Sequence, residues 1–204
     1  ARDVVSQLAT NCDIVVENFR PGTLEKWGIG YEQLSALNPK LIMVRISGFG
    51  QTGPYRERPG YGFLGDAVGG MLHINGYPDL PPVRAAVPVT DMLTAVYGAL
   101  GAVMSLLSRG VTGKGQVVDA ALYESSFSLM ESHVIAYDQL GVVANRAATR
   151  LPGSSPNSLY PTADVQSHCG ARQHTHLVCQ GIGGGRIFGN HRRGSTVLGG
   201  EQFR

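Results

Sequence analysis

The chain has 204 residues, of which 43% are hydrophobic and 16% charged, and its formal net charge at pH 7 is only +2. This composition is typical of a soluble globular protein with room for one core of ordinary size, or one and a half domains, and it excludes a fibrous chain. The basic residues form no stripe, so no nucleic-acid partner is expected. Because glycine and polar residues interrupt every apolar run before about 18 residues, no membrane partner is expected either.

The three cysteines, Cys12, Cys169 and Cys179, are too few for a disulfide framework and indicate a reducing compartment. The start at Ala1 lacks the layout of a signal peptide. We therefore expect a cytoplasmic protein, or a mitochondrial matrix protein in a eukaryote. A helix-like segment leads at once into a strand, so we also expect that residues precede Ala1.

Strands and helices alternate in the first part of the chain. Short apolar runs predict strands at 14–17 and 41–46, and helices are predicted at 23–27 and 31–37 between Pro-Gly and Asn-Pro turns. This alternation predicts a mainly parallel sheet of the α/β class. The polar turn over 18–22 lies where open α/β sheets bind ligands, although its residues also suit an ordinary surface turn.

A glycine-rich loop follows the second strand, over 47–55. It lacks the glycine spacing and the Lys-Ser/Thr pair of a phosphate-binding loop. A helix with a small-residue face is predicted over 63–71, and a turn cluster over 75–82 leads into the next helix.

A strongly apolar helix is predicted over 92–107, about 16 residues or roughly 24 Å, with Thr90 as its N-cap and Arg109-Gly110 marking its end. Large apolar residues at spacings of three and four predict that their face is buried, and glycines and alanines leave another side with little bulk. Asp91 itself suits two roles that position alone does not separate. It can satisfy free N–H groups at the helix start, or it can serve as a reactive carboxylate.

After this helix, a strand is predicted over 116–119 and a long helix over 120–140. From Val165 onward glycine, arginine and histidine dominate and neither strand nor helix periodicity persists, so this tail is not expected to pack a core. Its Cys and His residues match no standard zinc-finger spacing, and no metal site is expected. The residues concerned are Cys169, His174, His176 and Cys179.

Five short blocks carry a specific family pattern. They are ENFRPG at 17–22, ISGFGQTGP at 46–54, RPGY at 58–61, TD at 90–91 and GKGQ at 113–116. Together and in this order they resemble the class III CoA-transferases (CaiB/BaiF type), the family of formyl-CoA transferase and carnitine CoA-transferase. The resemblance covers residues 3–164, the middle part of a longer family chain. It implies a Rossmann-like parallel-sheet domain, incomplete here at both ends, in a homodimer of two interlocked subunits.

The resemblance also implies a chemistry. The family uses an aspartate at the place of Asp91 as a nucleophile that moves coenzyme A from an acyl-CoA to a small carboxylic acid through an aspartyl-CoA thioester, with no permanently bound cofactor. The substrate is thus itself a coenzyme A thioester. Residues that match the family's CoA-contacting segments, with Arg20 added because of its charge, are Asn18, Phe19, Arg20, Thr23, Lys26, Trp27, Arg58 and Tyr61.

Two alternatives stay open. The related α-methylacyl-CoA racemases have a histidine at the place of Tyr61, and tyrosine exchanges an α-proton poorly near neutral pH because its reference pKa is about 10. The chain can also be an inert fragment, since residues 165–204 resemble nothing in the family and are expected to be an aberrant or disordered tail, possibly out of frame. Gly62 stands where many family members have an acid, so no acid is expected at this position to help place the acceptor.

Overall fold

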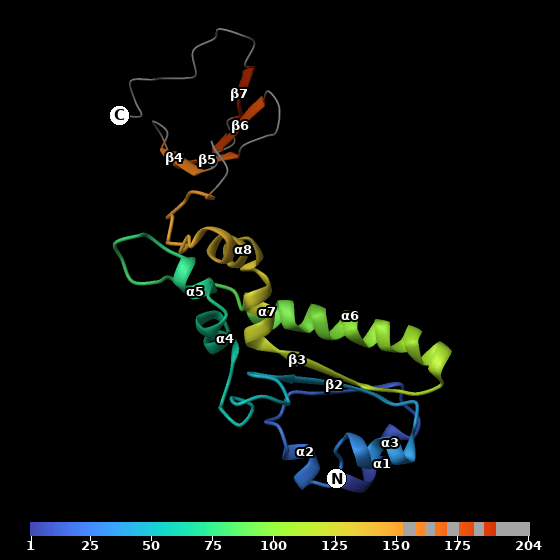
Figure 1. The fold of residues 1–204 in the computed structure, drawn as a ribbon. Helices are drawn as coiled ribbons and strands as arrows, with labels where there is room; N and C mark the ends of the chain where they lie inside the picture. The colour runs from blue at the N-terminus through green and yellow to red at the C-terminus, as the bar shows by residue number, and fades with distance from the viewer. Residues whose placement is uncertain (153–157, 162–165, 171–175, 182–185, 191–204) are drawn as a thin grey trace. The chain divides into compact units, whose positions relative to one another are not determined.

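The computed structural model describes residues 1–152, 158–161, 166–170, 176–181 and 186–190, with side chains up to Leu159 (Figure 1). The chain divides into two compact units. The first comprises residues 1–75 and 82–145, and the second comprises residues 76–81 and 146–204.

A three-stranded parallel sheet forms the centre of the first unit. Its strands are β1 (Ile14–Glu17), β2 (Ile42–Ser47) and β3 (Val117–Ala121), in the order β1-β2-β3. The central strand β2 is buried along almost its whole length, as expected for a parallel strand covered on both faces. The predicted α/β class and parallel sheet are confirmed.

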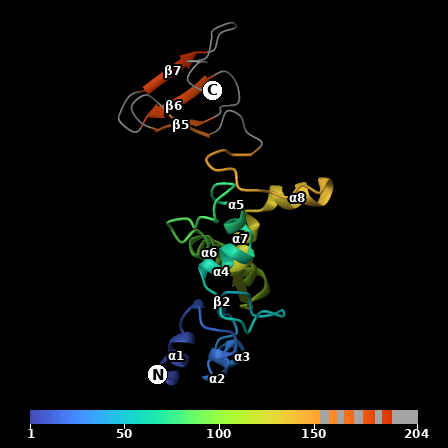
Figure 2. The ribbon, with the colours of Figure 1, turned by 90° about the vertical axis from the view of Figure 1, so that its left-hand side faces the viewer.

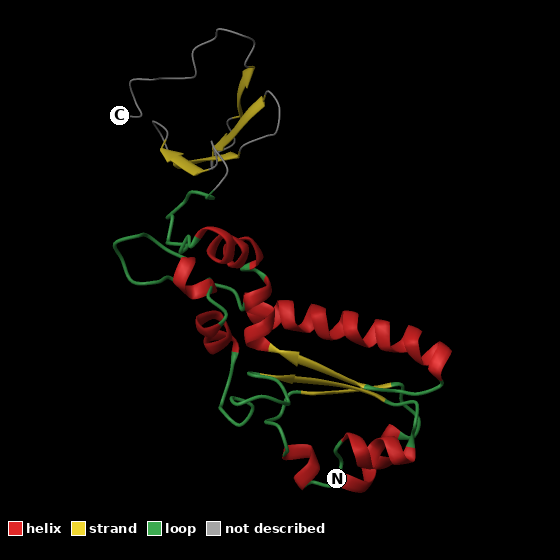
Figure 3. Cartoon of the chain, in the orientation of Figure 1, coloured by secondary structure: helices red, strands yellow, loops and turns green. Residues whose placement is uncertain are grey.

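Helices cover both faces of this sheet. On one face lie α1 (Arg2–Ala9), α2 (Thr23–Lys26) and α3 (Tyr31–Leu37), and on the other lies α6 (Val89–Thr112), as Figures 2 and 3 show. The core on the first face is made by Ala9, Leu24, Ile29, Leu34, Leu41 and Met43. The predicted strands and short helices of this region agree with the structure to within one residue.

Helix α6 is longer than predicted, with 24 residues, and it does not end at Gly110. Arg109 is held by hydrogen bonds to the carbonyl of Lys40, at 3.0 Å, and to the carboxylate of Asp13, at 2.7 Å, so its turn stays helical. Gly113, with a φ of 72°, adopts the left-handed C-cap instead. Thr90 is not the N-cap, because Pro88 takes that place and Thr90 lies inside the first turn.

The prediction of which face of α6 is buried is wrong. The buried residues are the small and polar ones, Thr90, Thr94, Gly98, Ala102 and Ser105. Glycines let the helix axis approach the sheet, since a methyl group added at Gly101 would lie 2.6 Å from a methyl carbon of Val118. The large apolar side chains are exposed instead, namely Met92, Val96, Leu100, Val103, Met104 and Leu107.

Among the described residues, α6 is the one helix long and apolar enough to meet the length and composition test for a membrane span. A helix that covers the sheet of a soluble protein passes the same test, and the polar side of α6 packs on β2 and β3. The expectation that the protein has no membrane partner stays a prediction.

Two other predicted helices are interrupted. The helix expected over 63–71 is divided into α4 (Gly62–Val68) and α5 (Met71–Ile74), because Gly70 takes a left-handed conformation with a φ of 94°. In the segment 120–140, β3 pairs with β2 as far as Ala121, and the remainder forms α7 (Leu122–Ser128) and α8 (Glu131–Leu140). Strand pairing and tertiary packing therefore override a continuous helical pattern.

The second unit contains a four-stranded antiparallel sheet with the order β4-β5-β6-β7. The strands are β4 (Ser158–Pro161), β5 (Gln166–Gly170), β6 (His176–Gly181) and β7 (Arg186–Asn190). Three of them lie in the segment whose sequence has no strand periodicity, and backbone pairing does not require such periodicity. The division predicted at 164/165 and the origin of the tail stay predictions. His174 and the side chains of Cys169, His176 and Cys179, for which no metal site is expected, lie outside the described residues.

Candidate active site

The three parallel strands end at the same edge of the sheet, where ligands bind in open α/β folds. The turn 18–22 follows β1, the glycine-rich loop follows β2, and α7 follows β3. The predicted site residues between 18 and 61 therefore come from segments that leave one edge.

A buried ion cluster supports the turn after β1. The Glu17 carboxylate, on a residue only 5% exposed, accepts a hydrogen bond from the backbone N–H of Phe19 at 2.8 Å and another from Arg45 Nε at 2.6 Å. The other guanidinium nitrogens of Arg45 donate to Glu25 on α2, at 2.7 and 3.2 Å. Arg45 thus ties β1, β2 and α2 together directly behind the turn.

Arg45 and Glu25 of this cluster favour each other's charged form. The pKa of Glu25 is lowered, chiefly by the hydrogen bond from Arg45. Burial works against the charge on Arg45, but hydrogen bonds to Glu25 and Glu17 outweigh it, and the pKa of the guanidinium is raised. We did not predict this cluster from the sequence. The available signal was a charged residue near the end of each of two buried strands.

The predicted residues on the turn and on α2 form one exposed group. Phe19 and Trp27, 48% and 50% exposed, meet edge to face with ring centroids 5.1 Å apart. Asn18, Arg20 and Lys26 are exposed and Thr23 is half-buried. An exposed aromatic pair beside two cations can bind a molecule that carries both a ring system and phosphates.

The loop after β2 folds back so that its two ends touch. The α-carbons of Gly48 and Gly60 lie so close that neither position has room for a side chain. Arg58 places its guanidinium 4.0 Å from the centre of the Tyr55 ring. Tyr61 follows Gly60 and is 61% exposed, so both predicted residues of this loop are accessible to a ligand.

Asp91 lies in the first turn of α6 with its side chain exposed. Its carboxyl group packs against the α-carbon of Gly62, the first residue of α4. A methyl group at Gly62 would lie 2.8 Å from Asp91 Cγ and 2.9 Å from Oδ1. Asp91 is thereby brought next to the residue that follows Tyr61. The glycine at position 62, where the family resemblance led us to note a missing acid, provides the space for this contact.

Helix α4 holds the start of α6 through a face made of small residues. Gly65 packs on Thr90 and on Leu122 of α7. A methyl group added at Gly65 would lie 3.0 Å from the methyl carbon of Thr90. The buried Asp66 accepts a hydrogen bond from the Thr90 hydroxyl. The residue before Asp91 is therefore fixed from two sides, which orients the first turn of α6.

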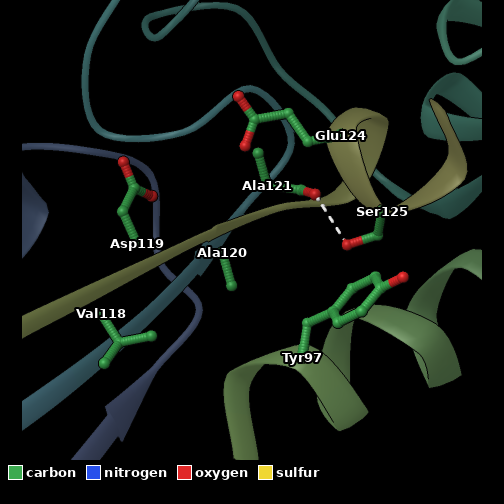
Figure 4. Close-up of a pocket in the computed structure, with 7 residues that line it drawn as sticks. All are labelled: Tyr97, Val118, Asp119, Ala120, Ala121, Glu124 and Ser125. Atoms are coloured by element: carbon green, nitrogen blue, oxygen red, sulfur yellow. Dashed lines mark hydrogen bonds between the residues drawn. The ribbon is translucent and has the colours of Figure 1, made fainter. Parts of the chain in front are cut away.

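A cavity of about 270 Å³ lies beside β3 but contains none of the predicted site residues. Figure 4 shows its lining, in which the Ser125 hydroxyl donates to the Ala121 carbonyl at 3.0 Å. The lining residues are Tyr97, Val118, Asp119, Ala120, Ala121, Glu124 and Ser125. The predicted site residues therefore form two groups outside this cavity. One group is Asp91 with Tyr61, which both adjoin Gly62. The other group consists of the aromatic and basic residues after β1.

Comparison with known proteins decides the family. The model of CoA-transferase family III matches residues 1–196 of the chain. The chain belongs to CoA-transferase family III. The resemblance inferred from the five sequence blocks is confirmed, and the match extends beyond residue 164.

Relatives in this family have named activities. The succinyl-CoA–D-citramalate CoA-transferase of Chloroflexus aurantiacus is 50% identical over 161 residues, which are 79% of this chain and 40% of that protein. The β subunit of succinyl-CoA–L-malate CoA-transferase from the same organism is 46% identical over 144 residues, 70% of this chain and 36% of that subunit. The chain therefore spans well under half the length of these relatives.

The fold agrees with a solved structure of the family. A CAIB/BAIF family protein from Brucella suis superposes with a TM-score of 0.78 at 35% sequence identity. The similarity covers 83% of this chain and 45% of the Brucella protein. The Rossmann-like fold class expected for the family is thereby supported by a solved relative.

Proposed function

We propose that this CoA-transferase family III chain carries the nucleophile and part of the coenzyme A site of an enzyme that moves coenzyme A between carboxylic acids. The observation that carries this proposal is the exposed Asp91 carboxylate, held at the start of α6 against Gly62. The names of the Chloroflexus relatives support the same reaction class.

In the proposed reaction, a carboxylate oxygen of Asp91 attacks the thioester carbonyl of the acyl-CoA. The C–S bond breaks, the CoA thiolate leaves, and a mixed anhydride joins Asp91 to the acyl group. The thiolate then attacks the Asp91 carbonyl, which releases the donor acid and leaves an aspartyl-CoA thioester. An acceptor carboxylate repeats these two steps in reverse, so that its acyl-CoA departs and the Asp91 carboxylate is regenerated.

Two features of the site suit this sequence of steps. Asp91 lies in the first turn of α6, where the helix dipole stabilises its negative charge. Free N–H groups near a helix start can stabilise the oxyanions that form during acyl transfer, an effect of about 3 kcal/mol per donor. The exposure of the carboxylate leaves its oxygens open to attack a substrate.

Coenzyme A itself is proposed to bind the residues after β1 and the loop after β2. Arg20 and Lys26 supply charges for its phosphates, and the Phe19–Trp27 pair offers ring faces and edges to its base. Arg58, stacked on Tyr55, and Tyr61 supply further exposed groups from the loop after β2. Asn18 and Thr23 complete it with hydrogen-bonding groups.

We further propose succinyl-CoA as the donor and a second dicarboxylic acid as the acceptor, since both Chloroflexus relatives are named for such acids. An interlocked homodimer and a cytoplasmic or mitochondrial matrix location are part of the same proposal. Racemase activity is not preferred, because Tyr61 is a poor acid and base near neutral pH.

The first experiment looks for the covalent intermediate. The purified chain is incubated with succinyl-CoA, one half is treated with hydroxylamine, and peptides are examined by mass spectrometry. A CoA adduct is expected on the peptide that contains Asp91, removed by hydroxylamine and absent in Asp91→Ala. Asp138→Asn, which changes an exposed carboxylate on α8, should keep the adduct. A folded chain without any adduct would refute the proposed nucleophile in this chain.

A further inference from the structure

One cation in the segment that precedes α6 is not used by the function proposed above. Arg84 is exposed, in the segment that leads from α5 to α6. Its neighbour Val83 is fixed by Asn75, whose side-chain amide donates to the Val83 carbonyl at 2.7 Å and whose carbonyl accepts from the Val83 N–H at 3.0 Å. The backbone that presents Arg84 is therefore held in place.

The guanidinium of Arg84 lies over the ring of Phe63, with its central carbon 5.4 Å from the ring centre. Phe63 is the second residue of α4, directly after Gly62, which packs against the Asp91 carboxyl group. The cation and the proposed nucleophile therefore border the same first turn of α4.

Arg84 has no carboxylate partner among the residues that the structure describes, and its ring contact is a weak one at an exposed site. A carboxylate can offer the guanidinium two parallel charge-assisted hydrogen bonds, which are considerably stronger. Arg84 can thus exchange the ring for an incoming carboxylate, whereas Arg58, in the loop after β2, is stacked on Tyr55.

We infer that Arg84 binds the second carboxylate of a dicarboxylic substrate, the one that does not react with Asp91. This inference rests on the proposed CoA transfer and adds to it a specificity-determining residue. Donor and acceptor acids occupy the same place in the two halves of the reaction, so Arg84 serves both. A monocarboxylic acid of the same length has no second carboxylate for the guanidinium, which then stays on the Phe63 ring and does not contribute to binding.

The test compares succinyl-CoA with butyryl-CoA, which has four acyl carbons but ends in a methyl group. The rate of the Asp91 adduct is measured for the wild type, Arg84→Gln, Arg84→Lys and the control Arg2→Gln, an exposed arginine of α1 paired with Asp3. Arg84→Gln is expected to lower the succinyl-CoA rate about tenfold or more and the butyryl-CoA rate less than about twofold. Arg84→Lys should retain part of the preference, and Arg2→Gln all of it.

A second measurement does not depend on turnover. Binding of free succinate and of butyrate to the same variants is followed by ligand-observed NMR, with circular dichroism as the check of folding. Succinate binding to the wild type that Arg84→Gln weakens, with butyrate unaffected, supports the inference even if no adduct forms and the proposed CoA transfer fails. Equal losses for both thioesters, or succinate binding indifferent to Arg84, would overturn the inference and leave the proposed transfer intact.

Discussion

Single residues determine how the proposed nucleophile is presented. The Asp91 carboxyl group occupies space that any side chain at position 62 would take, and the residue before it is held by Asp66 and Gly65. Behind the other part of the site, the Glu17–Arg45–Glu25 cluster fixes the turn after β1. Both arrangements depend on contacts between distant parts of the chain.

Replacing Gly62 by alanine is expected to push the Asp91 carboxyl group away from its present position. Misplacing a reacting group by about 1 Å can cost about a hundredfold in rate, so the adduct rate should fall at least about tenfold with the fold retained. Ala67→Ser, at an exposed position of the same helix, is the control and should leave the rate unchanged. An unchanged rate in Gly62→Ala would show that the contact with Gly62 does not orient Asp91.

The ion pair of Glu25 with Arg45 predicts a pH-dependent contribution to stability. The pKa of Glu25 is lowered in the folded chain from its reference value of 4.5. The contribution is therefore fully present above that reference value and is lost as the pH falls through the lower folded pKa. Because Glu25 is 42% exposed at its side chain, we expect only about 0.5–1 kcal/mol at neutral pH.

The measurement is urea unfolding of the wild type and Glu25→Gln between about pH 7 and about pH 3. The stability difference between the two proteins should be largest at neutral pH and vanish at the acid end. Glu32→Gln, at an exposed position of α3, is the control and should show no such trend. A difference that grows with acidity would contradict the assignment.

At the scale of elements, α6 packs through its smallest residues rather than its most apolar ones. Gly101 faces Val118 on β3, whereas Gly110, on the same helix, has open space around it. Gly101→Ala is therefore expected to cost about 1–3 kcal/mol through overpacking. Gly110→Ala should gain about 0.5–1 kcal/mol, because alanine favours the helix.

Chemical denaturation of the two variants measures both changes. Equal stabilisation by the two alanines would mean that α6 does not approach the sheet as closely as in the structure.

The strands and short helices could be predicted because each is a local apolar run between strong turn signals. The buried face of α6 could not be predicted. A periodic apolar pattern predicts that the large side chains point toward the core, whereas in α6 the small and polar residues do so. The interruptions at Gly70 and Met130 depend on packing between elements. Asp91 was found through family blocks, while Arg45, Glu17 and the role of Gly62 require the strand register and long-range contacts.

At the scale of the whole molecule, all predicted site residues lie in the first unit. The second unit contains the segment 165–204, for which we keep the proposal of a sequence read out of frame. Translation of the encoding DNA in its other two frames should then yield sequence that continues the family pattern after Asp164. Failure to find it in either frame would count heavily against this origin, as does the reach of the family match to residue 196.

The close packing of α6 on the sheet limits how the substrate specificity of such a protein can change. Sliding or turning the helix would bring a bulkier residue to the places of Gly98 and Gly101, against Val44 and Val118. The proposed nucleophile Asp91 therefore lies on a helix whose position cannot shift gradually. Adaptation to longer, shorter or differently charged acids is left to the segment 82–88, which carries Arg84 and whose exposed side chains can be exchanged while Asp91 stays in place.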